Sequence, residues 1–211
     1  MTYERKWDLD VLTKKEFWQL IEAAKGSKES KTVGGLRLAA MMATMGGAGL
    51  RLTELLSLEV KDVDTKRATL TVQRGKGGKL RRVAVAKSCM AVISEWLEER
   101  EEQKPAPFAA PGAKKPVHLV FCSFGKRGSG KPVWQSRIAR DLHELAESIG
   151  LEKRCNPHSF RHSHACWMAE DGVPIHSIRR QLGHGSLRTT DIYLTELVPD
   201  AFDDGRVKFD V

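Results

Sequence analysis

Apolar residues recur every three or four positions in the segment LTKKEFWQLIEAAKG, residues 12–26, which is the period of an amphipathic helix. Thr13 stands directly before this pattern and Glu16 follows three residues later, which is the arrangement of a capping box. Gly26 stops the pattern, because glycine is favoured just past the last helical turn. The segment is therefore predicted to be a helix that begins after Thr13 and ends before Gly26.

Helical patterns continue through most of the chain. Residues 34–48 are apolar on nearly every side, which predicts a helix buried at the centre of the molecule. Further helices are expected at residues 51–58, 88–103, 132–149, 157–171, 174–182 and 187–195. The segment of residues 103–116, rich in Pro, Ala and Lys, is interpreted as a surface loop.

The period changes to two in ATLTVQ, residues 68–73, and in RVAV, residues 82–85. The glycine-rich RGKGGK, residues 74–79, lies between them, so these residues predict a β-hairpin. HLVF, residues 118–121, is expected to form a short strand, and residues 206–211 either add an edge strand to the same sheet or remain a frayed chain end. The predicted fold class is α+β, mainly helical with a small antiparallel sheet.

Composition limits the classes of protein to consider. The chain has 211 residues, of which 41% are hydrophobic, and this is enough for a packed core. Its formal charge of +8 favours a polyanionic partner. The four cysteines form no CxxC pair, so neither a zinc knuckle nor a disulfide framework is indicated. No window approaches the roughly 18 apolar residues of a membrane span, and the chain begins without an apolar signal segment, so we expect a soluble cytoplasmic protein with no membrane partner.

Two apparent motifs do not predict a ligand site. GKRGSGKP, residues 125–132, has the glycines and lysine of a phosphate-binding P-loop, but Pro132 stands where a Ser or Thr would hold Mg²⁺. His158 and His162 are spaced as two zinc ligands could be, yet the sequence places no obvious third ligand. We therefore expect no metal and no other cofactor.

Histidines and arginines are concentrated in residues 156–194. Asn156 is a favoured N-cap and Pro157 a favoured first helical residue, so a helix is expected to begin here. His158 and Arg161 then fall in its first turn, on the same face. Free backbone N–H groups and the helix dipole would add to the guanidinium, which predicts an anion site suited to a phosphate diester.

A second histidine lies between two glycines in LGHGS, residues 182–186. Ser186 can cap a following short helix, and this helix carries Tyr193. A phenol is thus presented beside an imidazole on a separate element. The complete set of candidate catalytic residues is Arg51, Lys76, His158, Arg161, His184 and Tyr193.

These residues lie in four segments that resemble the boxes of the tyrosine recombinases, the phage integrase family. The segments are GAGLRLTELLSL for the first arginine, RGKGGK for the lysine turn, HSFRH for the HxxR box, and LGHGSLRTTDIYL for the second histidine and the tyrosine. The interval of nine residues from His184 to Tyr193 is also similar to that of the family. The resemblance covers roughly residues 11–196 and implies the catalytic fold of that family.

The resemblance implies DNA cleavage and rejoining through a covalent intermediate. Tyr193 would attack the scissile phosphate, giving a 3′-phosphotyrosyl bond and a free 5′-hydroxyl without ATP or metal. Arg51 and Arg161 would bind the charge that develops on the non-bridging oxygens. His158 would assist proton transfer at the tyrosine, and His184 would donate a hydrogen bond to the phosphate.

Lys76 would protonate the departing 5′ oxygen, with Lys79 on the same turn as the alternative. Glu54, three residues after Arg51, is expected to orient that arginine by pairing with it. These assignments come from the resemblance and from helical spacing together.

Other residues have both a structural and a functional interpretation. His162 and His164 are expected to be structural or to support the site from behind. Trp134 and Gln135, with Arg137 and Arg140 on the following helix, either face DNA or belong to an ordinary solvated surface.

The resemblance implies site-specific recombination of double-stranded DNA, as in integration of a mobile element. It also implies self-association as a dimer or tetramer on DNA, and an accessory DNA-binding protein is a further candidate partner. Most members place a separate DNA-binding domain before the catalytic one, whereas compact members such as the fimbrial-switch recombinases do not. We expect residues 1–211 to form a single catalytic domain, with an N-terminal extension of residues 1–12 and a C-terminal tail of residues 197–211.

Two other functions remain open from the sequence. A type IB topoisomerase would use the same Arg, Lys, His and Tyr chemistry to relax supercoils without synapsis. A non-enzymatic DNA-binding regulator derived from a recombinase would be expected to have lost a catalytic residue, and all six are present.

Overall fold

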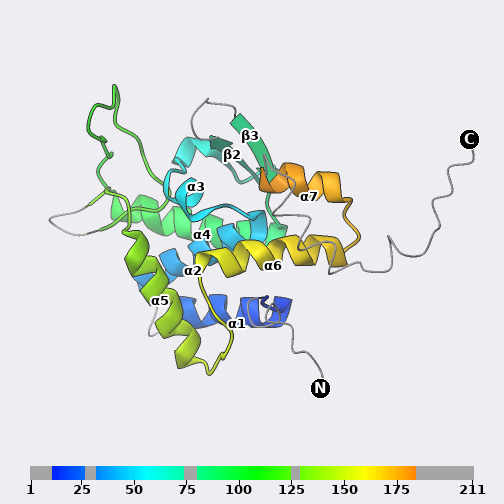
Figure 1. The fold of residues 1–211 in the computed structure, drawn as a ribbon. Coiled ribbons are helices and arrows are strands. Elements are labelled where there is room, and N and C mark those ends of the chain that lie inside the picture. Colours follow the sequence, from blue (N-terminus) through cyan, green and yellow to red (C-terminus); the bar gives the residue numbers. More distant parts are fainter. Residues whose placement is uncertain (1–10, 27–31, 74–79, 125–128, 184–211) are drawn as a thin grey trace, which may run out of the picture.

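The computed structural model describes residues 11–26, 32–73, 80–124 and 129–183, which form a mainly helical fold with a small antiparallel sheet (Figure 1). The helices are α1 (Lys14–Lys25), α2 (Val33–Ala48), α3 (Leu52–Leu56), the 3-10 turn η1 (Val60–Asp62), α4 (Lys87–Gln103), α5 (Gln135–Ser148), α6 (Pro157–Glu170) and α7 (Ile175–Leu182). The strands are β1 (Val63–Asp64), β2 (Thr69–Gln73) and β3 (Leu80–Ala84). The predicted α+β class is confirmed.

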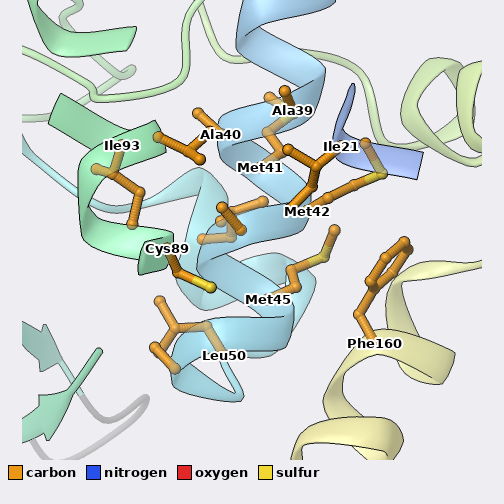
Figure 2. Packing of buried hydrophobic residues seen from close by; sticks show 14 of the residues in the cluster. Ile21, Ala39, Ala40, Met41, Met42, Met45, Leu50, Cys89, Ile93 and Phe160 are labelled. Atoms are coloured by element: carbon orange, nitrogen blue, oxygen red, sulfur yellow. The ribbon is translucent and has the colours of Figure 1, made fainter. Parts of the chain in front are cut away.

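Helix α2 forms the centre of the fold because it has no polar face. Its residues 39–48 are all buried, and α1, α4 and α6 pack around it (Figure 2). Two glycines allow the closest approaches. A Cβ on Gly46 would lie 2.4 Å from the ring of Phe17, and a Cβ on Gly47 would lie 2.5 Å from the Cβ of Cys89. Larger residues at these positions would therefore push α1 and α4 away from the core.

Helix α1 begins as its sequence predicts. Thr13 Oγ1 accepts a hydrogen bond from the backbone N–H of Glu16 at 3.2 Å, and the Glu16 carboxylate accepts one from the backbone N–H of Thr13 at 2.7 Å. Lys153 pairs with Glu16 at 2.8 Å, and the backbone N–H of Leu12 donates to Ser163 Oγ at 2.8 Å. The cap therefore also fastens the start of α1 to the later half of the chain.

The predicted hairpin is confirmed as strands β2 and β3. They pair antiparallel from Thr69 opposite Ala84 to Gln73 opposite Leu80, and β1 pairs with the other edge of β2. Helix α7 lies against β3 (Figure 1). The glycine-rich turn of residues 74–79 lies outside the described residues.

Helix α5 begins three residues later than predicted, at Gln135. Pro132 pairs with Cys122 in an isolated β-bridge, which keeps the preceding segment extended. Trp134 then serves as the N-cap without a capping side-chain bond. Within the described ranges, no helix has the length and apolar character that crossing a membrane requires.

The prediction of a regular strand at residues 118–121 is wrong. This segment forms a single antiparallel bridge, Leu119 with Glu59, and the chain bends directly after it, so no ladder of strand pairs forms. The helix predicted at residues 187–195 and the strand predicted at residues 206–211 lie outside the described residues.

Replacing Gly47 by Ala should destabilise the protein by about 1–3 kcal/mol, because the new methyl group would overlap Cys89 and force α2 away from α4. Gly34→Ala, in the first turn of the same helix, is the matched control. Its Cβ would meet nothing closer than Thr32 Oγ1 at 4.0 Å, so it should be neutral or stabilise by up to about 1 kcal/mol. Urea unfolding of both variants measures the difference, and equal stabilities would contradict this account of the packing.

Candidate active site

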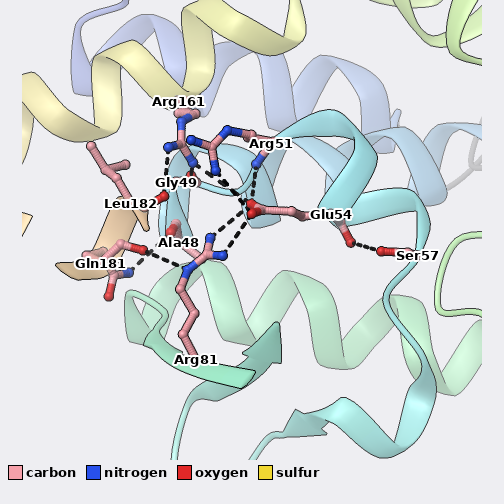
Figure 3. A network of polar contacts seen from close by, with 9 residues as sticks. All are labelled: Ala48, Gly49, Arg51, Glu54, Ser57, Arg81, Arg161, Gln181 and Leu182. Atoms are coloured by element: carbon pink, nitrogen blue, oxygen red, sulfur yellow. Dashed lines mark hydrogen bonds and ion pairs between the residues drawn. The ribbon is translucent and has the colours of Figure 1, made fainter. Parts of the chain in front are cut away.

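Arg51 lies in the turn between α2 and α3 and pairs with Glu54, as the spacing of the two residues predicts. Its backbone N–H donates to Glu54 Oε2 at 2.9 Å, and its Nη1 donates to Oε1 at 3.2 Å (Figure 3). Gly49 ends α2 in the left-handed conformation, with φ of 69°, and this turns the chain toward Arg51. The Arg51 side chain is 45% exposed, so its guanidinium is accessible to a ligand.

Arg161 is buried in α6 and points to the same turn. Its Nη1 donates to the carbonyl of Gly49, and its Nη2 donates to the carbonyl of Leu182 at 2.7 Å (Figure 3). Nη1 also lies 4.0 Å from Glu54 Oε2. Burial, followed by the nearby charge of Arg51, lowers the pKa of Arg161 to about 10, so the guanidinium keeps its charge at neutral pH.

The first turn of α6 differs from the expected anion site. Asn156 caps the helix as predicted, but its Oδ1 accepts hydrogen bonds from the backbone N–H groups of both His158, at 2.8 Å, and Ser159, at 3.1 Å. The expectation that these N–H groups are free for a phosphate is therefore wrong. What this turn can offer an anion is the exposed His158 side chain and the positive end of the helix dipole.

Arg81 of β3 is a third guanidinium at the site, which the sequence analysis missed. Its Nη1 and Nη2 donate to the two oxygens of Glu54 at 2.8 and 2.9 Å, and its side chain is only 8% exposed (Figure 3). One signal was available, because strand alternation places Arg81 on the same face as the buried Val83 and Val85. A charge on an inward face requires a partner.

Glu54 is the common partner of these arginines. Burial alone would raise the pKa of Glu54, but the hydrogen bonds from Arg81 and from the backbone N–H of Arg51, with the charges of both side chains, outweigh it and hold the pKa below its ordinary value. The carboxylate is therefore ionised at neutral pH. It stands among three guanidiniums, which leaves an excess of positive charge beside the exposed face of Arg51.

Gln181, near the end of α7, joins the site to β3. Its Nε2 donates to the carbonyls of Ala84, at 2.7 Å, and Ala48, at 3.2 Å, and its Oε1 accepts from the backbone N–H of Ala84 at 3.1 Å. Arg81 Nε lies 3.4 Å from the backbone carbonyl of Gln181. The end of α7, which leads into residue 184, is thus held against β3 and the end of α2.

His162 and His164 are both buried on α6, in agreement with a structural or supporting place. Nδ1 of His164 lies 2.7 Å from the carbonyl of Gly46, which can only accept, so Nδ1 carries the proton. Nε2 is buried and has no hydrogen-bond partner among the described residues. Burial lowers the pKa of His164 to about 4, so this imidazole is neutral at physiological pH.

Trp134, the residue singled out as either DNA-facing or solvated, is 81% exposed at the start of α5. The basic residues beside it have acidic partners on the same helix. Arg137 pairs with Asp141 at 3.3 Å, and Arg140 pairs with Glu144 at 3.6 Å.

The structure brings together Arg51 and Arg161, with His158 at the start of the same helix as Arg161. Lys76, Lys79, His184 and Tyr193 lie outside the described residues. Within the described residues, no group of three or more His, Cys, Asp or Glu side chains is arranged to hold a metal ion.

Comparison with known proteins defines the class of this chain. Residues 10–198 match the model of the phage integrase family, so the chain belongs to that family. It is 33% identical over 182 residues to tyrosine recombinase XerA of Pyrococcus furiosus, which covers 86% of this chain and 56% of that protein. It is 32% identical over 174 residues to tyrosine recombinase XerD of Listeria monocytogenes, covering 82% of this chain and 54% of that protein.

The fold agrees with this membership. The crystal structure of XerA recombinase matches with a TM-score of 0.70 and 27% sequence identity, over 94% of this chain and 66% of that chain. The chain spans little more than half the length of the two curated relatives named above.

The His164 site predicts a pH dependence of stability. The unfolded chain binds a proton near the ordinary pKa of 6.5, whereas the folded protein excludes it until about pH 4, so stabilisation is complete above pH 6.5 and is lost as the pH falls through this window. The full effect is about 3 kcal/mol. His164→Asn can keep the donor to Gly46 but cannot titrate.

The dependence of stability on pH is measured by thermal unfolding between pH 6.5 and 5. This interval lies above the range in which Glu54 and Glu16 titrate in the folded protein, because the pKa of each is lowered. The wild-type protein should lose stability across that interval, and the His164→Asn variant should lose markedly less. The same slope in both proteins would show that another group is responsible.

Proposed function

We propose that this protein is a site-specific DNA recombinase that cleaves and rejoins phosphodiester bonds through a covalent 3′-phosphotyrosyl intermediate. The observation that carries the proposal is the convergence of Arg51 and Arg161 on one carboxylate, in a chain that belongs to the phage integrase family. Two fork-shaped donors are suited to the non-bridging oxygens of a phosphate diester.

The charge of the site supports an anionic substrate. Arg51, Arg81 and Arg161 surround a single carboxylate, so a phosphate diester would offset positive charge that the protein leaves uncompensated. Phosphorane-like transition states carry more charge on these oxygens than the ground state does. Donors that are already positioned therefore stabilise the transition state more than the bound substrate.

In the proposed reaction, Tyr193 Oη forms a bond to phosphorus and loses its proton, with His158 assisting that transfer. The bond between phosphorus and the 5′ oxygen breaks, and Lys76, or Lys79 as the alternative, protonates the departing oxygen. His184 donates a hydrogen bond to the phosphate. Attack by a 5′-hydroxyl from another strand reverses these steps and completes strand exchange.

The partner proposed for this chemistry is double-stranded DNA, to which the formal charge of +8 contributes attraction. Strand exchange needs two duplexes, so self-association as a dimer or tetramer on DNA belongs to the proposal, and an accessory DNA-binding protein is a further candidate partner. Residues 1–211 are proposed to act as one catalytic domain at work in the cytoplasm, in association with the nucleoid when bound to DNA.

Tyr193→Phe should abolish the covalent protein–DNA adduct that forms on a nicked suicide substrate and resists SDS, because the attacking oxygen is gone. DNA affinity, measured by fluorescence anisotropy, should change little. An adduct that persists in the variant would assign the nucleophile elsewhere. Adduct formation by the wild-type protein should also survive excess EDTA, since none of the proposed steps uses a metal.

Lys76→Ala should slow cleavage of ordinary DNA by roughly 10²- to 10⁴-fold, the usual contribution of a general acid. On a substrate whose bridging 5′ oxygen is replaced by sulfur, the leaving group departs without a proton, and the variant should recover most of the wild-type rate. Lys79→Ala is the control. If the sulfur substrate restores the rate of Lys79→Ala and not that of Lys76→Ala, Lys79 is the acid. If each variant has the same defect on both substrates, neither lysine is the acid.

A further inference from the structure

We propose that Arg81 is a positioning residue that occupies Glu54 and thereby keeps the guanidinium of Arg51 available for the scissile phosphate. The inference rests on the proposed function, because it assigns Arg51 to the phosphate. Arg81 itself is buried and directed at the carboxylate, so it acts through Arg51 without touching DNA.

The hydrogen bonds around Glu54 leave its carboxylate fully used. Two carboxylate oxygens offer about four acceptor positions. Arg81 takes one on each oxygen, at 2.8 and 2.9 Å. The backbone N–H of Arg51 takes a third on Oε2 at 2.9 Å, and only the fourth, on Oε1 at 3.2 Å, goes to the Arg51 side chain. Arg51 therefore spends one of its five side-chain donors on Glu54 and keeps the rest.

Without Arg81, the same carboxylate would draw Arg51 inward. Arginine and carboxylate favour a two-bond, fork-to-fork arrangement, and Glu54 is only three residues from Arg51. In that arrangement the charge of Arg51 would be neutralised and its fork would be turned away from the DNA. Arg81 prevents this by forming the two-bond arrangement itself.

Arg81 also connects Arg51 with the segment that leads toward the proposed nucleophile. Its Nε lies 3.4 Å from the carbonyl of Gln181, and a Cβ placed on Gly183 would lie 2.8 Å from its guanidinium carbon. One side chain of β3 thus contacts both the carboxylate that sets Arg51 and the end of α7. A shift of α7 would therefore move Arg81 and change its hydrogen bonds to Glu54.

Within the part of the chain that the structure describes, the charged side chains that face Glu54 are Arg51 of the α3 cap, Arg81 of β3 and Arg161 of α6, while α7 contributes the neutral Gln181. Without the hydrogen bonds and charge of Arg81, less opposes the effect of burial, so the pKa of the Glu54 carboxyl should rise. Protonation of Glu54 removes the charge that draws Arg51 inward, so the cleavage defect of an Arg81 variant, relative to the wild-type protein, should become smaller as the pH falls.

The experiment compares Arg81→Met and Arg81→Lys with Arg82→Met in the full chain. Arg82, the next residue of β3, is exposed and gives the same loss of charge. At saturating suicide substrate, Arg81→Met should form adduct roughly 10- to 100-fold more slowly, with its DNA dissociation constant within about threefold of the wild-type value. Arg81→Lys, a point charge without the fork, should recover part of the rate, and Arg82→Met should keep it.

Two further measurements separate positioning from a general loss of structure. In an E54Q background, Arg81→Met should cost at most about threefold, because the carboxylate that captures Arg51 is gone. Phenylglyoxal, which modifies accessible arginines, should label Arg51 readily in the wild-type chain, less in Arg81→Met, and readily again in the double variant. Mass spectrometry of the peptide that contains Arg51 reports this without DNA.

A wild-type cleavage rate in Arg81→Met would overturn the inference, as would equal losses of rate and affinity, an undiminished effect in the E54Q background, or unchanged labelling of Arg51. If Arg81→Met does not fold, Arg81→Lys decides by the same criteria. If the wild-type chain forms no adduct at all, the proposed function fails. The labelling of Arg51 then still decides whether Arg81 keeps that guanidinium free.

Discussion

The carboxyl end of α2 needs hydrogen-bond donors, and much of the structure follows from that need. The last carbonyls of a helix have no partner within it, and α2 ends inside the protein, where water cannot replace them. From the later elements, His164 donates to Gly46 at 2.7 Å, Gln181 to Ala48 at 3.2 Å and Arg161 to Gly49, while the backbone N–H of Ala86, just before α4, donates to Gly47 at 3.2 Å. Packing of α6 and α7 against α2 is thus enforced by polar groups as much as by apolar contact. One of these donors, Arg161, is also a proposed catalytic residue.

The site combines this structural role with an imbalance of charge. A buried arginine is costly unless hydrogen-bonded, and Arg161 meets that condition with two carbonyls and the nearby Glu54. Those bonds hold its guanidinium in one orientation before any ligand arrives. Preorganisation of this kind is what makes donors effective in catalysis, because no free energy is spent on orienting them during the reaction.

Local sequence patterns predicted those features that depend on neighbours in the chain. The capping box of Thr13 and Glu16 and the β2–β3 hairpin were predicted correctly for that reason. The late start of α5 depends on a bridge between Pro132 and Cys122, and no helical pattern contains that information.

The least predictable parts of the site are the long-range ones. Strand alternation places Arg81 inward, but its partner comes from another element, 27 residues away. The bond from Arg161 to Gly49 spans 112 residues. Helical spacing predicted the pairing of Arg51 with Glu54. Only the three-dimensional structure shows that Arg81 takes a hydrogen bond on each oxygen of that carboxylate.

During biosynthesis, the 112 residues between Gly49 and Arg161 separate the appearance of these two partners in time. A ribosome adds roughly 5–20 residues per second, so Arg161 follows Gly49 by roughly 5–20 seconds. During that interval α2 can pack against α1 and α4 and Ala86 can pair with Gly47, but the carbonyls of Gly46, Ala48 and Gly49 still lack their donors. The growing chain must therefore keep this end hydrated until α6 and α7 arrive. The point at which the protein becomes compact is also the point at which its two proposed phosphate-binding arginines first meet.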